Sequence, residues 1–441
     1  MKKQTIITSV RFGAILIAVL YCISSISALA ADQASFHVIT YFEKLGPPAG
    51  LVEASSGVFY STGSLSPYPV FSLSLQGPET VLAAFPSSRF AGAGLVLGDN
   101  GRLYSTVVNT SKQTSVFSVA SVAGSKKVYP VQPVSPVFTQ NLPDGALLGV
   151  ASGALGTFYL VTADRNGNVT TFYQFPAGET PLLIAVYASD GNCYGVSVLP
   201  DGSAYVYRAT LSGSVTKIYN FASQSFDWSA ASSLIQASDG DLYGTTSKGG
   251  SGYGSIYKLT LDGQYTPLHS LRPSSLSQAP AALIEASDGN LYGTTIGGSS
   301  QLFRITKSGN FTVLRTLNLY TEGECDCWLI QGSDGNIYGA ATLGGLHGLG
   351  DFFSLDAGLP KPKPSAQNFH PAAGSAGTNV RIWGTNLLAA SVQFNGTPAT
   401  VVSNSGSNYV WATVPEGATT GPITVTTPGG TVTTTDDFTV Q

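Results

Sequence analysis

Two segments of the chain combine aromatic and acidic side chains in a way that suits sugar binding. One spans residues 222–232 and the other residues 318–328. The candidate binding residues are Phe226 and Trp228 in the first segment and Tyr320, Glu322 and Trp328 in the second. Aromatic rings stack on the apolar CH faces of a sugar, while its hydroxyl groups donate hydrogen bonds to carboxylates. The two segments therefore predict a glycan site, unless the tryptophans begin strands and only pack.

The second segment also offers a catalytic chemistry. Glu322 and Asp326 would form an acid/base pair if the fold placed them about 5–10 Å apart across a glycosidic bond. The sequence shows no nucleophile elbow, histidine cluster or phosphate-binding loop beside them. We therefore predict no catalytic residues, and a polysaccharide hydrolase or lyase using Glu322 and Asp326 is the alternative.

Cysteine usage predicts neither a metal site nor a disulfide framework, and we expect no cofactor. Cys325 and Cys327 form a C-x-C pair in the second segment. Two thiolates are too few for zinc, and a bond between them would be strained. Cys193 stands where other repeats have leucine or isoleucine, so we expect a core residue there.

A heptapeptide that occurs four times indicates how these segments are displayed. Ser-Asp-Gly-Asn/Asp, an apolar residue and Tyr-Gly begin at Ser189, Ser238, Ser287 and Ser333, and the tyrosines are 49, 49 and 46 residues apart. A fixed period of this size indicates one supersecondary unit used repeatedly. Asp-Gly pairs suit tight turns, and none of these turns supplies the several oxygens that Ca²⁺ needs. We therefore predict that the aspartates shape turns and that the tyrosines pack between units.

Each unit predicts four strands. In the unit from Ser233, short alternating runs cover residues 233–237, 242–246, 255–260 and 264–271. Four antiparallel strands in about 47 residues are one blade of a β-propeller. Degenerate copies around Tyr60, Tyr104 and Tyr159 raise the count to seven blades within residues 31–358. The last unit lacks its fourth strand, so we predict that strand 35–43 closes the ring.

The C-terminal region predicts a second domain. Residues 359–365, with alternating Pro and Lys, favour an extended and semi-stiff linker. Residues 366–441 contain about seven short alternating strands, a pattern typical of an immunoglobulin-like sandwich. The predicted fold is all-β: a seven-bladed β-propeller followed by an immunoglobulin-like β-sandwich.

Both parts resemble known families. The repeats SDGDLYGTTSKGGSGYGSIYKLTLDG and SDGNLYGTTIGGSSQLFRITKSGNFTVL resemble the bacterial tandem repeat called GloVer, found in exported "choice-of-anchor" proteins. The run Gly384-Thr385-Asn386-Leu387 and the later Pro428-Gly429-Gly430 resemble the IPT/TIG domain. The first resemblance implies no activity for particular residues, and the second implies a spacer or adhesive module. Some related domains bind DNA, but Arg381 is the only basic residue in 366–441.

The N-terminus predicts export. Lys2, Lys3 and Arg11 precede an apolar run that ends in Ala28-Leu29-Ala30, which predicts a signal peptide over residues 1–30. An uncleaved anchor is the alternative. Cleavage would leave 18 basic and 25 acidic side chains, a net charge of −7, which gives no reason to expect nucleic acid.

These observations lead to one functional expectation with two alternatives. We expect a monomeric exported protein, periplasmic, extracellular or at the cell surface, with no stable transmembrane segment after cleavage. Its variable propeller loops would bind an extracellular glycan or a cell-surface protein without catalysis. The alternatives are the hydrolase or lyase above and a purely structural envelope or matrix component.

Overall fold

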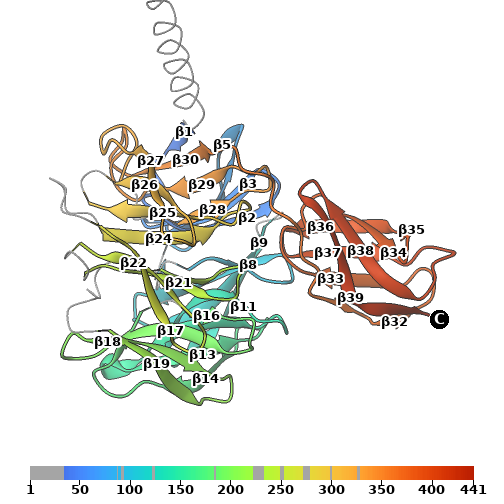
Figure 1. Cartoon of the computed structure of the whole chain (residues 1–441), viewed down its shortest axis with the longest axis horizontal. Helices are drawn as coiled ribbons and strands as arrows, with labels where there is room; N and C mark the ends of the chain where they lie inside the picture. Colours follow the sequence, from blue (N-terminus) through green and yellow to red (C-terminus); the bar gives the residue numbers. More distant parts are fainter. Residues whose placement is uncertain are drawn as a thin grey trace, which may run out of the picture.

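The computed structural model consists almost entirely of β-strands in two parts, a propeller and a C-terminal sandwich (Figure 1). It describes residues 34–86, 88–90, 94–121, 125–182, 185–221, 233–248, 253–271, 279–297, 300–324 and 328–441. The predicted all-β fold, a β-propeller followed by an immunoglobulin-like sandwich, is confirmed. The predicted signal peptide lies outside the described residues.

Between residues 35 and 356, the described strands form seven antiparallel sheets, here called blades 1 to 7 in chain order. Blade 1 contains β2 (Pro48–Ser55), β3 (Val58–Gly63), β4 (Pro69–Ser74) and β5 (Gly77–Ala84). Blade 2 contains β6 (Ser88–Phe90), β7 (Val96–Leu97), β8 (Arg102–Asn109), β9 (Thr114–Ala120) and β10 (Lys126–Gln132). Blade 3 contains β11 (Ser135–Asn141), β12 (Leu147–Ser152), β13 (Phe158–Ala163) and β14 (Val169–Gln174). Blade 4 contains β15 (Thr180–Pro181), β16 (Val186–Tyr187), β17 (Cys193–Val198), β18 (Ala204–Ala209) and β19 (Val215–Phe221). Blade 5 contains β20 (Leu234–Gln236), β21 (Leu242–Thr246), β22 (Ser255–Leu259) and β23 (Tyr265–Ser270). Blade 6 contains β24 (Ala279–Glu285), β25 (Leu291–Ile296), β26 (Gln301–Ile305) and β27 (Phe311–Thr316). Blade 7 contains β28 (Leu329–Gln331), β29 (Ile337–Ala340), β30 (Asp351–Asp356) and β1 (Ser35–Tyr41).

The strand β1 completes the last blade from the other end of the chain. It pairs antiparallel with β30, with Ser35 opposite Asp356 and Tyr41 opposite Asp351. The Phe36 ring lies 5.1 Å from that of Phe353, centroid to centroid. Blade 7 therefore has four strands, although its own segment supplies three.

The hydrophobic core lies between neighbouring blades, and the motif tyrosines are part of it. Tyr243 of blade 5 is fully buried in one cluster with Leu291 and Phe303 of blade 6. Between blades 7 and 1, the ring of Tyr338 lies 4.4 Å from that of Phe59. The prediction that the tyrosines pack between units is confirmed.

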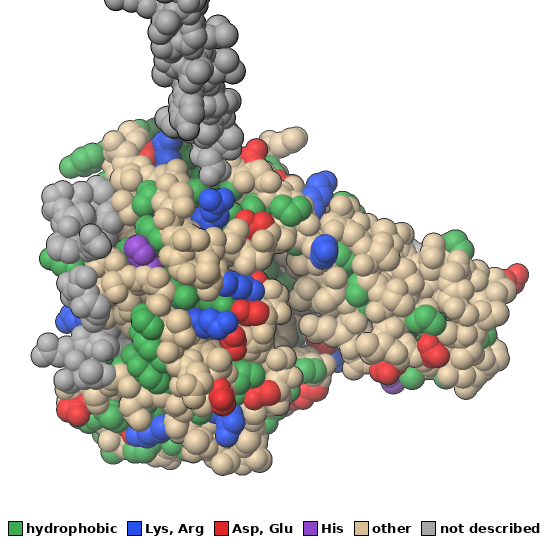
Figure 2. Space-filling model, in the orientation of Figure 1, with side chains coloured by type: hydrophobic (Ala, Val, Ile, Leu, Met, Phe, Trp, Pro, Cys, Tyr) green, Lys and Arg blue, Asp and Glu red, His purple; other side chains and the backbone are tan. Residues whose placement is uncertain are grey.

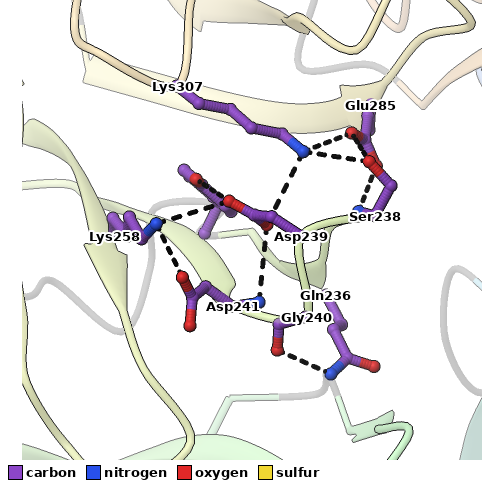
Figure 3. A network of polar contacts seen from close by, with 9 residues as sticks. Gln236, Ser238, Asp239, Gly240, Asp241, Lys258, Glu285 and Lys307 are labelled. Carbon is purple, nitrogen blue, oxygen red and sulfur yellow. Dashed lines mark hydrogen bonds and ion pairs between the residues drawn. The ribbon is translucent and has the colours of Figure 1, made fainter.

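The serine of each repeated motif connects its blade to the next one. Ser238 donates hydrogen bonds from its amide and its hydroxyl to the two carboxylate oxygens of Glu285, both at 2.6 Å (Figure 3). The same amide contact is made by Ser189 to Gln236, Ser287 to Gln331 and Ser333 to Glu53, each at 2.8 Å. We call these four contacts the blade latches. The latch between Ser333 and Glu53 joins blade 7 to blade 1.

The motif aspartate shapes the turn, as predicted. The carboxylate of Asp190 accepts hydrogen bonds from the backbone amide of Asn192 at 3.1 Å and from the hydroxyl of Tyr194 at 2.7 Å. Asp239 in blade 5 also lies 3.3 Å from the ammonium group of Lys258 and 3.6 Å from that of Lys307 in blade 6 (Figure 3). The carboxylates of Asp190 and Asp239 are thus engaged in hydrogen bonds and ion pairs within the protein.

The C-terminal domain is a sandwich of two sheets. One contains β31 (Asn368–His370), β33 (Asn379–Trp383), β37 (Tyr409–Thr413) and β36 (Thr400–Gly406); the other contains β32 (Ala373–Gly374), β39 (Gly430–Val440), β38 (Gly421–Thr427), β34 (Ser391–Phe394) and β35 (Thr397–Pro398). Their inner faces enclose one apolar cluster that includes Val380, Phe394 and Phe438. Charged side chains are mostly visible on the propeller and few appear on this domain (Figure 2).

The linker lies against both domains instead of acting as a free spacer. The carbonyl oxygen of Pro360 accepts hydrogen bonds from Ser287 and, at 3.2 Å, from Gln331 of the propeller. On the other side, Asn386 donates to the carbonyl oxygen of Lys363 at 2.9 Å. The extended shape that Pro and Lys favour is therefore fixed by contacts.

Candidate functional site

The two faces of the propeller carry different connections. We call the strands of a blade a to d in the order given above, so that β1 is strand d of blade 7. In blades 2 and 4 the two short strands that pair with the same neighbour, β6 with β7 and β15 with β16, together count as strand a. Because the strands are antiparallel, the a–b and c–d turns lie on one face, the turn face, and the b–c and d–a segments lie on the other, the loop face. The predicted binding residues belong to d–a segments and therefore to the loop face. Three of the predicted residues are described, namely Tyr320, Glu322 and Trp328, whereas Phe226, Trp228 and Asp326 lie outside the described residues, as do Cys325 and Cys327.

The d–a segment before blade 7, residues 318–324, is fastened to the b–c loop of the same blade. The amide of Glu324 donates to the carbonyl oxygen of Leu343 at 2.7 Å, and that of Gly345 donates to Leu319 at 2.9 Å. Main-chain bonds across two loops restrict both of them, so side chains between these bonds have a defined position.

Two further features hold these loops together. Gly344 and Gly345 have φ angles of +76° and +70°, a backbone that favours glycine, and a β-carbon on Gly344 would overlap the carbonyl oxygen of Leu319. The hydroxyl of Tyr41 in β1 donates to the carbonyl oxygen of Thr321 at 3.1 Å. The strand that completes blade 7 thus also supports the loop.

The fastened loops present apolar side chains to solvent. Tyr320 is 79% exposed, Leu343 54% and Leu346 60%; we call these three residues the loop platform. Trp328 directly precedes β28 and is 43% exposed, so it is only partly packed. Exposed large apolar residues gathered on fixed loops mark interaction sites more often than scattered ones do.

The carboxylate of Glu322 is engaged in contacts that hold its own loop in place. Its carboxylate pairs with the guanidinium of Arg315 and accepts the amide of Asn318 at 3.0 Å. Glu324 likewise accepts the amide of Gly297 at 3.0 Å. Of the predicted acid/base pair, the described member therefore holds the loop in place.

Beneath the platform lies a carboxyl group that the sequence did not single out. Asp351, the first residue of β30, is fully buried, and neither of its carboxyl oxygens has a hydrogen-bond partner among the described residues. Burial, with a smaller effect from the charge of Glu322, raises the pKa of Asp351 to about 8. β-Carbons on Gly323 and Gly345 would lie 3.2 and 3.4 Å from this carboxyl group, so the glycines leave space beside it.

A sequence signal for Asp351 does exist. In blades 5 and 6 the strand equivalent to β30 begins with Ser255 and Gln301. A buried carboxyl group at a position that is neutral in the other two blades is unusual, because burying a carboxylate is costly. The described residues contain no group of three or more His, Cys, Asp or Glu side chains that could hold a metal ion.

Two family models cover most of the described chain. A model described as the Gloeobacter/Verrucomicrobia repeat matches residues 132–353, and the IPT/TIG domain matches residues 364–440. No curated protein sequence matches the chain. Within the part of the chain that the structure covers, no helix has the length and apolar character needed to cross a bilayer.

The chain is also similar in structure to several solved enzymes. A fungal alcohol oxidase of the AA5 family, solved with copper, has a TM-score of 0.51 at 14% identity, covering 93% of this chain and 100% of the oxidase. An oligogalacturonate lyase from Vibrio parahaemolyticus has a TM-score of 0.48 at 13% identity, covering 74% and 97%. A periplasmic gluconolactonase from Pseudomonas aeruginosa has a TM-score of 0.44 at 13% identity, covering 71% and 97%. At these identities the likeness concerns the fold alone.

Proposed function

We propose that this chain, which belongs to the Gloeobacter/Verrucomicrobia repeat family, is an exported, non-catalytic binding protein whose loop platform recognises an extracellular glycan. The observation that carries the proposal is Tyr320, 79% exposed on a loop fastened by main-chain hydrogen bonds. An aromatic ring held in position before binding loses little conformational entropy when a sugar stacks on it.

The positions of Glu322 and Asp351 favour binding over hydrolysis. A general acid or base must reach the bond that it acts on, within about 3 Å or through one water molecule. Glu322 is engaged by Arg315 and Asn318, and Asp351 is fully buried. Neither group faces a ligand on the surface of the platform.

A glycan array followed by titration of the best ligand tests the proposal. We expect Tyr320→Ala to weaken binding about tenfold or more, since losing a stacked ring costs at least about 1.4 kcal/mol. Tyr320→Phe keeps the ring and should bind within about threefold of the wild type.

Leu155→Ala serves as the control, because Leu155 is a fully exposed apolar residue of blade 3. Equal binding by Tyr320→Ala and the wild type would remove the platform as the site. The absence of any glycan or cell-surface ligand would instead favour a structural role.

A further inference from the structure

The turn face carries a groove that differs in charge from the rest of the protein. The groove lies at blades 2 and 3 and has a volume of about 570 Å³. Its nine lining residues include four basic side chains and no acidic one: Arg102, Lys126, Lys127 and Arg165. The whole chain has a formal net charge of −4. A concentration of positive charge on an acidic protein calls for an explanation.

The basic groups of this groove are held in place mostly without carboxylates. Arg102 donates to the carbonyl oxygens of Ser118 at 3.2 Å and Ser125 at 2.8 Å. The ammonium of Lys126 donates to the carbonyl oxygen of Ala84 at 2.9 Å. Carbonyl oxygens fix the position of a cation but leave its charge uncancelled.

The other two basic residues of the groove, Lys127 and Arg165, have a ring and a carboxylate as partners. The ammonium of Lys127 lies 4.7 Å from the centre of the Tyr129 ring. Arg165 is the one member that pairs with a carboxylate, that of Asp99, which is itself buried. The groove and its immediate support therefore hold four positive groups and one negative group.

The repeated blades show the opposite arrangement. On the same face, Lys258 lies 2.6 Å from Asp241 and Lys307 lies 2.7 Å from Glu285 (Figure 3). Those lysines are neutralised by neighbouring carboxylates. Among the described residues, Arg102, Lys126 and Lys127 lack the carboxylate partner that Lys258 and Lys307 have, and only Arg165 has one. The groove therefore keeps a net positive charge that an anion from outside can meet.

We infer that this groove is a second binding site, for an acidic oligosaccharide that carries carboxylate or sulfate groups. Its volume lies within the roughly 300–1,000 Å³ typical of small-ligand sites, which suits a few sugar units. Ser125 and Asn166 add a hydroxyl and an amide to the lining, groups that pair with sugar hydroxyls. A long nucleic acid would meet the acidic remainder of the surface.

This site goes beyond the loop platform and lies on the opposite face of the propeller. Titration calorimetry with the full chain would compare a hexuronate trisaccharide, a neutral trisaccharide and inorganic sulfate. We expect the hexuronate to bind more tightly than the other two by about tenfold or more, and its affinity to fall about threefold or more between about 20 and 200 mM salt, because salt screens exposed charges.

Variants separate this site from the platform. The double change Lys126→Gln and Lys127→Gln should weaken hexuronate binding about tenfold or more, whereas Lys112→Gln, an exposed lysine on the b–c loop of the same blade, should leave it unchanged. Tyr320→Ala should also leave it unchanged. Equal binding of the neutral trisaccharide or of sulfate, tighter binding of an oligonucleotide, or full binding by the double variant would overturn the inference.

Discussion

Asp351 shows how one substitution in a repeat changes the chemistry of a blade. Its carboxyl group is fully buried beside the space that Gly323 and Gly345 leave open, and its pKa is raised to about 8. An unfolded aspartate ionises near pH 4. Between these two values the folded protein holds a proton that the unfolded chain has released. The stabilisation from this group is therefore complete below about pH 4 and is lost as the pH rises toward 8.

We predict that Asp351→Asn stabilises the protein increasingly at higher pH. The neutral amide has nearly the shape of the protonated carboxyl group, so the two proteins should unfold at similar urea concentrations at about pH 4, below which both states of the wild type are protonated. By pH 8 the variant should be more stable by about 2 kcal/mol or more, at up to about 1.4 kcal/mol per pH unit. Asp356→Asn, at the exposed end of β30, is the control and should show no such trend. A constant difference between wild type and Asp351→Asn at all pH values would contradict the assignment.

The blade latch is the feature that matters most at the scale of elements. Ser238 donates two hydrogen bonds to Glu285, and the equivalent acceptors in the neighbouring latches are the amides of Gln236 and Gln331. A carboxylate is therefore not required by the latch itself. Glu285 differs because Lys307 lies 2.7 Å from it.

We predict different costs for two changes at this latch. Glu285→Gln keeps the acceptor for Ser238 and loses only an ion pair, so the free energy of unfolding should fall by less than about 1 kcal/mol. Glu285→Ala leaves the Ser238 amide without its partner and should cost about 1–3 kcal/mol. Urea unfolding of both variants measures the difference. Equal losses for the two variants would mean that the ion pair, and not the latch, stabilises the contact.

The sequence predicts the blades well because their determinants are local. Alternating apolar residues and Asp-Gly turns specify strands within one repeat, and β20 to β23 lie within the predicted ranges. Three of the latches join positions 44 to 47 residues apart, and the fourth joins Ser333 to Glu53, 280 residues away, so no single repeat reveals them. The burial of Asp351 depends on two loops that fold over it, and the groove depends on blades whose repeats are degenerate. These features come from contacts between segments, which local patterns do not specify.

At the scale of the whole molecule, the C-terminal domain is docked on the turn face of the propeller. Ser407 donates to the carbonyl oxygen of Glu53 at 3.0 Å, and Asn408 donates to those of Leu97 and Gly98 at 3.1 and 3.2 Å. These carbonyl groups belong to the a–b regions of blades 1 and 2. The domain therefore lies beside the proposed basic groove, and both lie on the turn face, opposite the loops that the sequence predicts to bind.

Arg381, the only basic residue of the C-terminal domain, takes part in this contact region. Its guanidinium lies 4.2 Å from the centre of the Tyr409 ring and 5.0 Å from that of Trp383. Burial lowers the pKa of Arg381, while the charge of Asp99 in the propeller opposes that shift. The Asp99 carboxylate of the propeller thus favours the charged form of a guanidinium in the C-terminal domain.

We predict that the double change Ser407→Ala and Asn408→Ala releases the docked domain. It removes three hydrogen bonds to the propeller, each worth about 1 kcal/mol, and leaves the linker contacts at Pro360 to hold the domains together. The domain should then sample more orientations, and small-angle X-ray scattering should give a larger radius of gyration and a longer maximum dimension. Asn379→Ala, on an exposed position of β33, is the control and should scatter like the wild type. Identical scattering from the double variant and the wild type would show that the linker and Arg381 suffice to fix the orientation.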